Sequence, residues 1–127
     1  MISALFNQPN YQAAQKLLDG TVLRHEAIAS NLANLETPRY QRVDLAPSFQ
    51  DAIRNAAASR DVSQIAAVQP QLAVDTTAVS SRRDGNTVQL ETELVQLNKN
   101  FLAHTLETQL ISGSLLRLRL AITGRPT

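Results

Sequence analysis

The side chains best suited to acid–base or metal chemistry are two histidines, and neither has the partners that such chemistry needs. His25 and His104 both fall within apolar helical patterns, and no two histidines stand four residues apart as they do in a zinc-protease helix. The carboxylates Glu91 and Glu93 would point to different sides of a helix, and Ser112–Ser114 has no base at a suitable spacing. We interpret both histidines as packing or hydrogen-bonding residues. The sequence predicts no enzymatic activity, no metal and no cofactor.

Composition excludes several further classes of protein. The 127 residues carry a net charge of +1 and include no cysteine, so disulfide bonds and thiol catalysis are excluded. Small basic clusters occur at Arg82–Arg83 and Arg117–Arg119, and we interpret them as solvated surface, because a nucleic-acid site would need a basic stripe with stacking aromatics. No apolar run approaches the roughly 20 residues of a membrane span, and Met1–Gln12 lacks the segments of a cleavable signal. We expect no nucleic-acid partner, no membrane insertion, and either a cytoplasmic location or export by another route.

The longest regular pattern runs from Leu90 to Ile122 and predicts one long helix. Its residues recur at alternating steps of four and three, the spacing of one helix face and of a coiled-coil seam. The first seam is Leu90, Leu94, Leu97, Phe101, His104, Thr108, Ile111, Leu115, Leu118 and Ile122. The second seam is Val95, Leu102, Leu106, Leu110, Leu116 and Leu120. Such a helix would be roughly 50 Å long and apolar on more than one side.

A softer pattern predicts another helix from about Tyr11 to about Asn34. Its apolar face is formed by Ala14, Leu18, Thr21, His25, Ile28, Leu32 and Leu35, which again step by four and three. We expect Asn10 to cap this helix, Gly20 to be a local weak point, and residues 1–9 to be an irregular lead. Antiparallel pairing of the two arms, connected through the insert, is the simplest geometry.

Turn signals mark the ends of both arms. Pro38 disfavours helix at the residue before it, so this region reads as a helix stop followed by a turn. Asp84–Asn86 is a turn signal, and either Asn86 or Thr87 could cap the C-terminal helix. Gly124 and Pro126 are typical of a helix stop.

The segment between the arms differs in kind. Pro47–Ala58 predicts a short helix, whereas residues 68–74 are extended in character and contain Pro70, which argues against a central strand. We expect this insert to be loosely structured and partly disordered. The predicted fold class is mainly α: an antiparallel helical hairpin with two long, coiled-coil-like arms. The predicted parts are an N-terminal arm with its turn over 1–40, an irregular insert over 41–86, and a C-terminal arm over 87–127.

A lone hairpin of these arms would not hide its apolar surface. The second seam would stay exposed, and burying one large apolar side chain is worth about 1.5–3 kcal/mol. A monomer is not expected to display such a patch, so we predict packing against neighbouring subunits. The predicted assembly interface is Leu18, Ile28, Leu32, Leu90, Leu94, Leu97, Phe101, Leu102, Leu106, Ile111, Leu115, Leu118 and Ile122.

Two blocks of sequence resemble a known family. Residues 31–40, Asn-Leu-Ala-Asn-Leu-Glu-Thr-Pro-Arg-Tyr, resemble the N-terminal motif of bacterial flagellar rod and hook proteins, commonly Asn-Ile-Ala-Asn followed by Thr-Pro-Gly-Tyr. Residues 84–100 resemble the C-terminal block of the proximal rod members. The residues that carry the resemblance are Asn31, Ala33, Asn34, Thr37, Pro38, Tyr40, Asp84, Gly85, Asn86, Glu91 and Asn100. Arg39 stands where the family usually has glycine. A positive φ would strain Arg39, whereas a type I turn with Pro38 at its second position would accept it.

The resemblance implies a structural role in the flagellar basal body. It implies a subunit of the proximal rod, which spans the periplasm, transmits torque and lines the export channel. It also implies export through the flagellar type III apparatus without a cleaved signal peptide. The implied partners are its own copies, FlgC-like rod subunits, a FliE-like adaptor and the export gate. The alternative is a soluble coiled-coil binding module, such as an export chaperone or a regulatory hairpin, which predicts a closed dimer.

Overall fold

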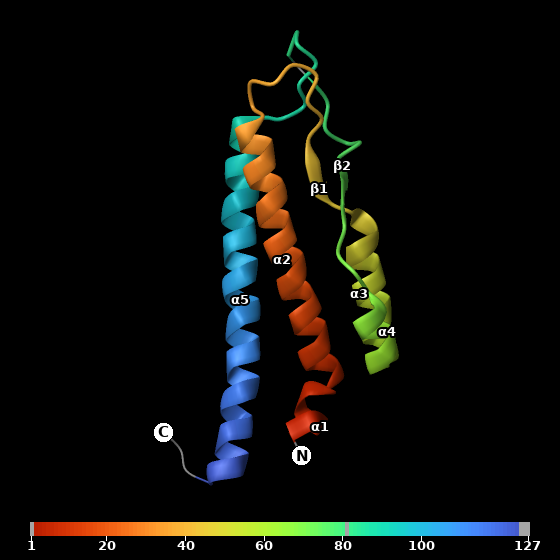
Figure 1. Ribbon diagram of the computed structural model, residues 1–127, viewed down its shortest axis with the longest axis vertical. Helices are drawn as coiled ribbons and strands as arrows, with labels where there is room; N and C mark the ends of the chain where they lie inside the picture. The colour runs from red at the N-terminus through yellow and green to blue at the C-terminus, as the bar shows by residue number, and fades with distance from the viewer. Residues whose placement is uncertain (1, 81, 125–127) are drawn as a thin grey trace.

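A computed structural model describes residues 2–80 and 82–124 and has a long helical hairpin as its frame (Figure 1). In chain order the elements are α1 (Ile2–Phe6), α2 (Pro9–Ala33), β1 (Val43–Leu45), α3 (Pro47–Ser59), α4 (Val62–Ala67), β2 (Leu72–Val74) and α5 (Leu90–Thr123). Helix α2 lies between α5 on one side and α3 with α4 on the other (Figure 1). The mainly α fold and the antiparallel hairpin are therefore confirmed, and α2 is the layer that holds the other two together.

The start of the N-terminal arm differs from the prediction. Helix α2 begins at Pro9, which suits a first helical position because its missing N–H has no partner there anyway. Gln8 precedes it with an extended backbone and no side-chain cap, so the expected cap at Asn10 was wrong. The expected irregular lead was also wrong, because α1 precedes α2 and the Phe6 ring meets Tyr11 edge-on at 5.3 Å between centroids.

Gly20 is a contact point and not merely a weak point in α2. A Cβ atom at this position would lie 2.8 Å from a ring carbon of Phe49 and 3.5 Å from a methyl carbon of Leu45. Phe49 belongs to α3 and Leu45 to β1, and both side chains are buried. The missing side chain therefore lets the insert approach the backbone of α2 closely.

The insert is more regular than expected. Helix α3 begins at Pro47 as predicted. Strands β1 and β2 pair antiparallel, with Val43 opposite Val74 and Leu45 opposite Leu72. Pro70 lies just before β2 and so withholds no hydrogen bond from the two-stranded sheet.

Apolar burial explains why the insert is ordered. Ile53 and Ala56 on α3 form a buried cluster with Ile65 on α4, and Ala13 on α2 packs against it. Short helices are marginal on their own, and this contact with α2 supplies the stabilisation. The expectation of a loosely structured insert was therefore wrong, because the two short helices bury their apolar faces together.

Helix α5 turns a polar face towards α2, and the first seam forms only part of the hairpin interface, through half-buried Leu97 and Ile111 and the contact of His104 with Thr21. Its buried residues are Glu93 and Asn100, and half-buried Glu107 and Ser114 follow at the same seven-residue interval. The physical reason is that buried polar groups need specific partners, which fix the rotation of a helix, whereas apolar groups accept many neighbours.

The C-terminal end of α5 agrees with the prediction, whereas its N-terminal cap does not. The helix begins after Gln89, which provides no side-chain cap, so the expected cap at Asn86 or Thr87 was wrong. At the other end Gly124 adopts a left-handed backbone with φ +62° and closes the helix as predicted. The predicted stop residue Pro126 lies outside the described residues.

Glu107 gives the hairpin a pH dependence that can be measured. Its Oε2 atom is buried and has no hydrogen-bond partner among the described residues. Burial raises the pKa of Glu107 from 4.5 to about 7. As the pH rises between these values, the unfolded chain releases the proton first, so the folded state loses stability. Above about pH 7 the penalty stays constant.

We therefore predict that Glu107→Gln stabilises the chain at alkaline pH and not at acid pH. Urea unfolding should show a gain of about 1–3 kcal/mol at pH 8 that vanishes near pH 4.5, discounted for the partial exposure of the carboxylate. Exposed Glu91 on the same helix is the control, and Glu91→Gln should show no such trend. An equal effect of Glu107→Gln at both pH values would contradict the prediction.

Candidate functional site

The predicted motif residues other than Asn100 lie at the closed end of the hairpin, where α2 ends and α5 begins (Figure 1). Asn31 is fully buried there, and its Nδ2 donates to the Val43 carbonyl at 2.8 Å and to Glu93 Oε2 at 3.2 Å. Its Oδ1 accepts from the Val43 N–H at 3.0 Å. The Tyr40 hydroxyl lies 3.0 Å from Ser30 Oγ beside it. One amide side chain thus joins α2, β1 and α5.

A buried ion pair lies next to Asn31. Arg42 Nε donates to Glu93 Oε1 at 2.5 Å, and Nη1 donates to Asp75 at 2.7 Å and pairs with Asp44 at 2.9 Å. Burial by itself lowers the pKa of the Arg42 guanidinium, but hydrogen bonds to Glu93 and Asp44 more than offset it and the pKa is raised. Hydrogen bonds from Thr77 and Arg42 lower the pKa of Asp75. Arg42 and Asp75 are therefore both charged throughout the physiological range.

Asn86 closes the end of α2 from the other side of the hairpin. Its Nδ2 donates to the carbonyls of Asn34 at 2.9 Å, Leu35 at 3.1 Å and Thr37 at 2.7 Å. Its Oδ1 accepts from the Val88 N–H at 2.8 Å, just before α5. These carbonyls belong to the turn that follows α2, so this one buried amide ties that turn to the chain just before α5.

Of the two turns that the sequence allowed after α2, the structure has the one with a positive φ at Arg39, which strains that residue. The Tyr40 N–H donates to the Thr37 carbonyl at 3.3 Å, and Arg39 has φ +60°. A positive φ at the third position is typical of a type II turn, so the type I turn that would accept arginine was wrong. The Arg39 N–H donates to the Asp84 carbonyl at 2.9 Å, beside Gly85 with φ +76°. The left-handed conformation costs about 1–2 kcal/mol in a residue with a side chain.

The remaining motif residues fall into two groups. Ala33, Pro38 and Glu91 are exposed at the closed end, where they are available to other proteins. Asn100 lies further along α5 and is buried, and its Nδ2 donates to the carbonyl of Thr21 at 2.8 Å. The motif therefore mixes residues that hold the hairpin with residues on its surface.

Sequence reasoning missed three residues of this region. Arg42 and Glu93 were not singled out as a pair, and Arg82 was interpreted as solvated surface. Instead Arg82 donates to the Leu35 carbonyl at 2.7 Å and pairs with Glu36 at 3.3 Å. The available signal was the polar series Glu93, Asn100 and Glu107, because polar residues at seven-residue steps within an apolar helix mark one face.

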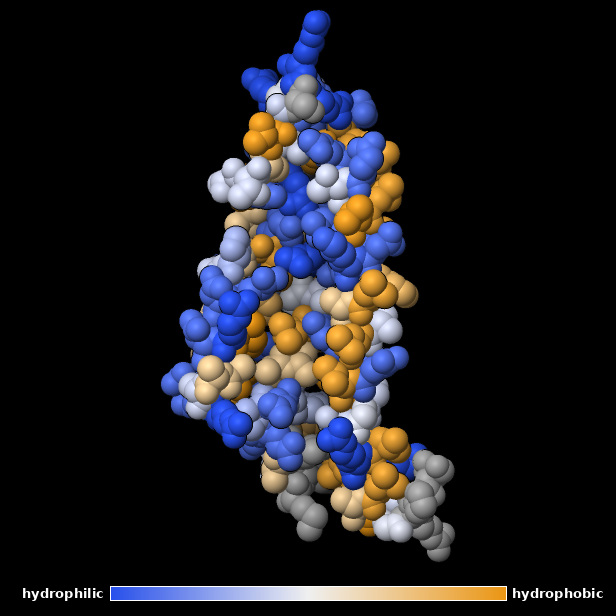
Figure 2. Space-filling model, turned by 180° about the vertical axis from the view of Figure 1, so that it is seen from behind, coloured by the Kyte–Doolittle hydropathy of each residue, from blue (hydrophilic) through white to orange (hydrophobic). Residues whose placement is uncertain are grey.

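The predicted assembly residues divide by exposure. Leu90, Leu94, Phe101, Leu102, Leu106, Leu115 and Ile122 are exposed, whereas Leu18, Leu32, Leu97, Ile111 and Leu118 are half-buried. Ile28 is buried within the chain's own packing. Figure 2 shows hydrophobic side chains gathered along the edge formed by α5. Phe101 and Leu102 both remain 67% exposed, so the apolar surface continues around the helix.

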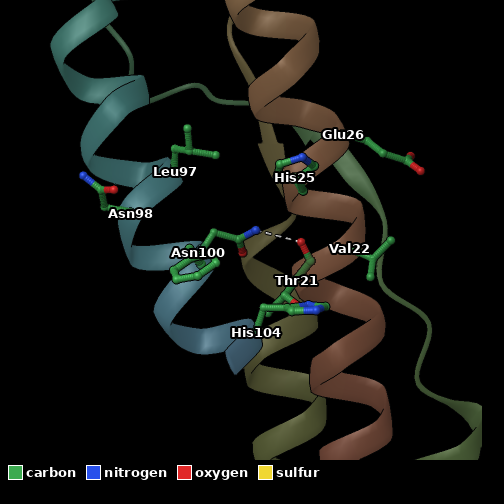
Figure 3. Close-up of a pocket in the computed structure, with 9 residues that line it drawn as sticks. Thr21, Val22, His25, Glu26, Leu97, Asn98, Asn100 and His104 are labelled. Atoms are coloured by element: carbon green, nitrogen blue, oxygen red, sulfur yellow. Dashed lines mark hydrogen bonds between the residues drawn. The ribbon is translucent and has the colours of Figure 1, made fainter. Parts of the chain in front are cut away.

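A groove runs between α2 and α5 on one face of the hairpin (Figure 3). Its volume is about 620 Å³, and its lining includes Val22, Leu97 and Phe101. His104 Nδ1 lies 3.2 Å from Thr21 Oγ1 at its floor. We call this surface the α2–α5 groove. Its exposed surface is mainly apolar, and of its two histidines, His25 and His104, the second is engaged in holding the two helices.

Neither a metal site nor a membrane span is found in the part of the chain that the structure describes. Residues 2–80 and 82–124 contain no group of three or more His, Cys, Asp or Glu side chains that could hold a metal ion. None of their helices combines the length and the hydropathy required to cross a bilayer. The surface of interest is thus the closed end with the apolar sides of α5.

Comparison with known proteins gives one informative relative. The flagellar basal body rod protein FlgB of Aquifex aeolicus is 30% identical over 113 residues, which cover 87% of this chain and 90% of the relative. No family model matches the chain. Because only 13% of the chain lies outside the alignment, the likeness extends well beyond the motif at the closed end.

We predict that Asn86→Ala destabilises the hairpin by about 2–4 kcal/mol, because it removes the hydrogen bonds to three turn carbonyls and leaves the buried Val88 N–H without its partner. Urea unfolding of the purified chain measures the change. The control is Asn98→Ala, which removes an exposed amide on α5 and should change stability by less than about 0.5 kcal/mol. Equal effects of the two substitutions would show that Asn86 does not hold the helix end.

We predict that Arg39→Gly stabilises the chain by about 1 kcal/mol, because glycine adopts a positive φ without strain. Thermal or urea unfolding measures the gain. Arg83→Gly is the matched control, since it removes another exposed arginine whose φ is not positive. A loss of stability in both variants would contradict the strain at Arg39.

Proposed function

The chain belongs to the FlgB family of flagellar basal body rod proteins, which are structural and not enzymatic, and from this premise we propose that it is a proximal rod subunit. In this role it transmits torque and lines the export channel. The single observation that supports the proposal best is the state of α5. Of the other described elements, only α2 makes substantial contact with this 34-residue helix.

The exposed surface of α5 is too apolar to be left in water. Large apolar side chains on it that are more than two-fifths exposed are Leu90, Leu94, Val95, Phe101, Leu102, Leu106, Leu110, Leu115, Leu116 and Ile122. Such a surface is typical of a protein interface and extends along the whole helix. Neighbouring helices in a rod would cover it, and their interlocked side chains would carry mechanical load.

The closed end supports a load-bearing role for each subunit. Arg42, Glu93 and Asn31 join α2, β1 and α5 through buried hydrogen bonds. A twisting force applied to α5 would therefore reach α2 and the insert without depending on apolar sliding contacts. This rigidity is what a torque-transmitting subunit requires.

The proposed partners are further copies, FlgC-like rod subunits, a FliE-like adaptor and the export gate. We also propose export through the flagellar type III apparatus. The parts of the chain would divide this work. The arms over 1–40 and 87–127 form the packed wall. Within the insert over 41–86, α3 and α4 lie on the far side of α2 from α5 (Figure 1), whereas Asn86 lies at the closed end against the turn after α2.

The test is to place a charge on the exposed part of α5 without disturbing the hairpin. Phe101→Asp and Leu102→Asp should each abolish swimming and recovery of the chain in purified basal bodies, because a buried unpaired carboxylate would oppose assembly. Circular dichroism of both variants should match the parent chain, since both side chains are exposed in the monomer. Leu97→Asp and Leu118→Asp should also block assembly. Because both leucines are half-buried, these variants also disturb the hairpin itself and so test the assembly surface less directly.

The control is Val79→Asp, which changes a side chain that is 77% exposed on the insert, and it should leave swimming intact. Normal swimming of both the Phe101 and Leu102 variants would overturn the proposal. A closed dimer of fixed size in sedimentation, with no chain in basal bodies, would instead favour a coiled-coil binding module.

A further inference from the structure

Two separate surfaces of the hairpin are unoccupied and complementary. We propose that the second seam of α5 of one copy packs into the α2–α5 groove of the next copy, with Lys99 facing Glu26. The inference rests on the proposed function, which brings copies side by side, and it goes further by naming the two faces that meet.

The groove is shaped to receive an apolar helix. Val22 on α2 lines the 620 Å³ hollow together with Leu97 and Phe101 on α5. Figure 3 shows Val22 and Glu26 projecting from the side of α2 turned away from α5, at the outer rim of the hollow, while Leu97 borders it from α5. Helices that bind such grooves insert side chains at steps of three and four residues. The occupant must therefore present an apolar strip of helical spacing.

The second seam provides that strip. Val95, Leu102, Leu106 and Leu110 are each more than half exposed. One residue step turns a helix by about 100°, so Leu102 lies on a different side of α5 from Phe101, which lines the groove. Both surfaces can be occupied at the same time without competing for the same residues.

Charge completes the match. Glu26 lies at the edge of the groove, one turn from Val22, and is exposed. Lys99 lies within the second seam, four residues after Val95 and three before Leu102, and is also exposed. Neither side chain has an ion-pair partner among the described residues. An acid beside one apolar surface and a base within the other favour their pairing.

The heights of these residues agree as well. Asn100 Nδ2 donates to the Thr21 carbonyl, so these two residues lie at one level of the hairpin. Because α2 and α5 run in opposite directions, Val22 and Lys99 are each one residue closer to the closed end than that level. Glu26 is about 6 Å higher, at 1.5 Å per residue, within reach of a lysine side chain. Neighbours need little axial shift to form the pair.

The pairing joins two different surfaces of the chain. Such a heterologous contact repeats from copy to copy, whereas a contact of one surface with itself stops at a dimer. The same groove and seam are then free on the outermost copies. The geometry thus predicts a directional array of hairpins.

Cysteine pairing in purified basal bodies tests the contact, and the chain contains no cysteine of its own. Cells express a tagged Val22→Cys chain together with an untagged Leu102→Cys chain. Oxidation should yield a mixed disulfide-linked dimer, and either variant expressed alone should yield none. Thr108→Cys replaces Leu102→Cys as the matched control, because Thr108 belongs to the first seam of α5, and it should give no dimer. A dimer from either single variant would overturn the proposal.

Charge exchange tests the pair independently. Lys99→Glu and Glu26→Lys should each weaken incorporation into basal bodies, on the order of fivefold per contact. The double variant Lys99→Glu with Glu26→Lys should restore it, and Arg54→Glu on α3 should have no effect. Failure of the double variant to recover would overturn the Lys99–Glu26 pair.

The outcomes separate this inference from the proposed function. If the parent chain is recovered in basal bodies while Val22 and Leu102 do not cross-link, the rod assignment stands and this pairing is wrong. If Leu102→Cys instead cross-links to a different rod protein, the second seam faces that protein and the pairing between copies is wrong. If the parent chain is absent from basal bodies, the proposed function itself fails.

Discussion

The buried ion pair between Arg42 and Glu93 determines how the two arms face each other. Glu93 on α5 also accepts from Asn31 on α2, so the pair fixes both the rotation and the height of α5. Removing one partner of a buried pair typically costs about 3–5 kcal/mol, because the other charge is left unpaired. That exceeds the contribution of one exposed leucine, so the polar contacts and not the leucines select the face. Further along α5, Asn100 makes another buried polar contact with α2, because its Nδ2 donates to the Thr21 carbonyl.

This choice of face explains why the apolar surface lies outside. If Glu93, Asn100 and Glu107 occupy the interface with α2, the leucines of both seams must lie at its flanks or opposite it. In a monomer that arrangement is unfavourable, since about 25 cal/mol is forfeited for each Å² of apolar surface left in water. In an assembly the same leucines become the contacts between subunits. The buried polar residues thus give each hairpin a defined shape, while the apolar residues remain for association.

Apolar spacing and turn signals predicted where the helices lie better than they predicted which side of each helix is buried. The long helix from Leu90, the helix start at Pro47 and the stop at Gly124 follow from local rules on spacing, φ and hydrogen-bond donors. The rotation of α5 does not, because it depends on Arg42, which lies 51 residues away in sequence from Glu93. The order of the insert escaped prediction for a related reason. Its short helices become stable only through contact with α2, and a bare Gly20 is part of that contact.

The closed end also shows why a strained turn can persist. Arg39 carries a left-handed backbone at a cost of about 1–2 kcal/mol, yet its N–H reaches the Asp84 carbonyl and its turn lies against Asn86. Several hydrogen bonds of about 1 kcal/mol each converge on this loop, so their sum exceeds the strain and holds the backbone in place. Arginine is therefore tolerated at position 39, in a turn that Asp84 and Asn86 hold from across the closed end. The same redundancy lets the exposed residues of the motif, Pro38 and Ala33, be presented on a rigid support.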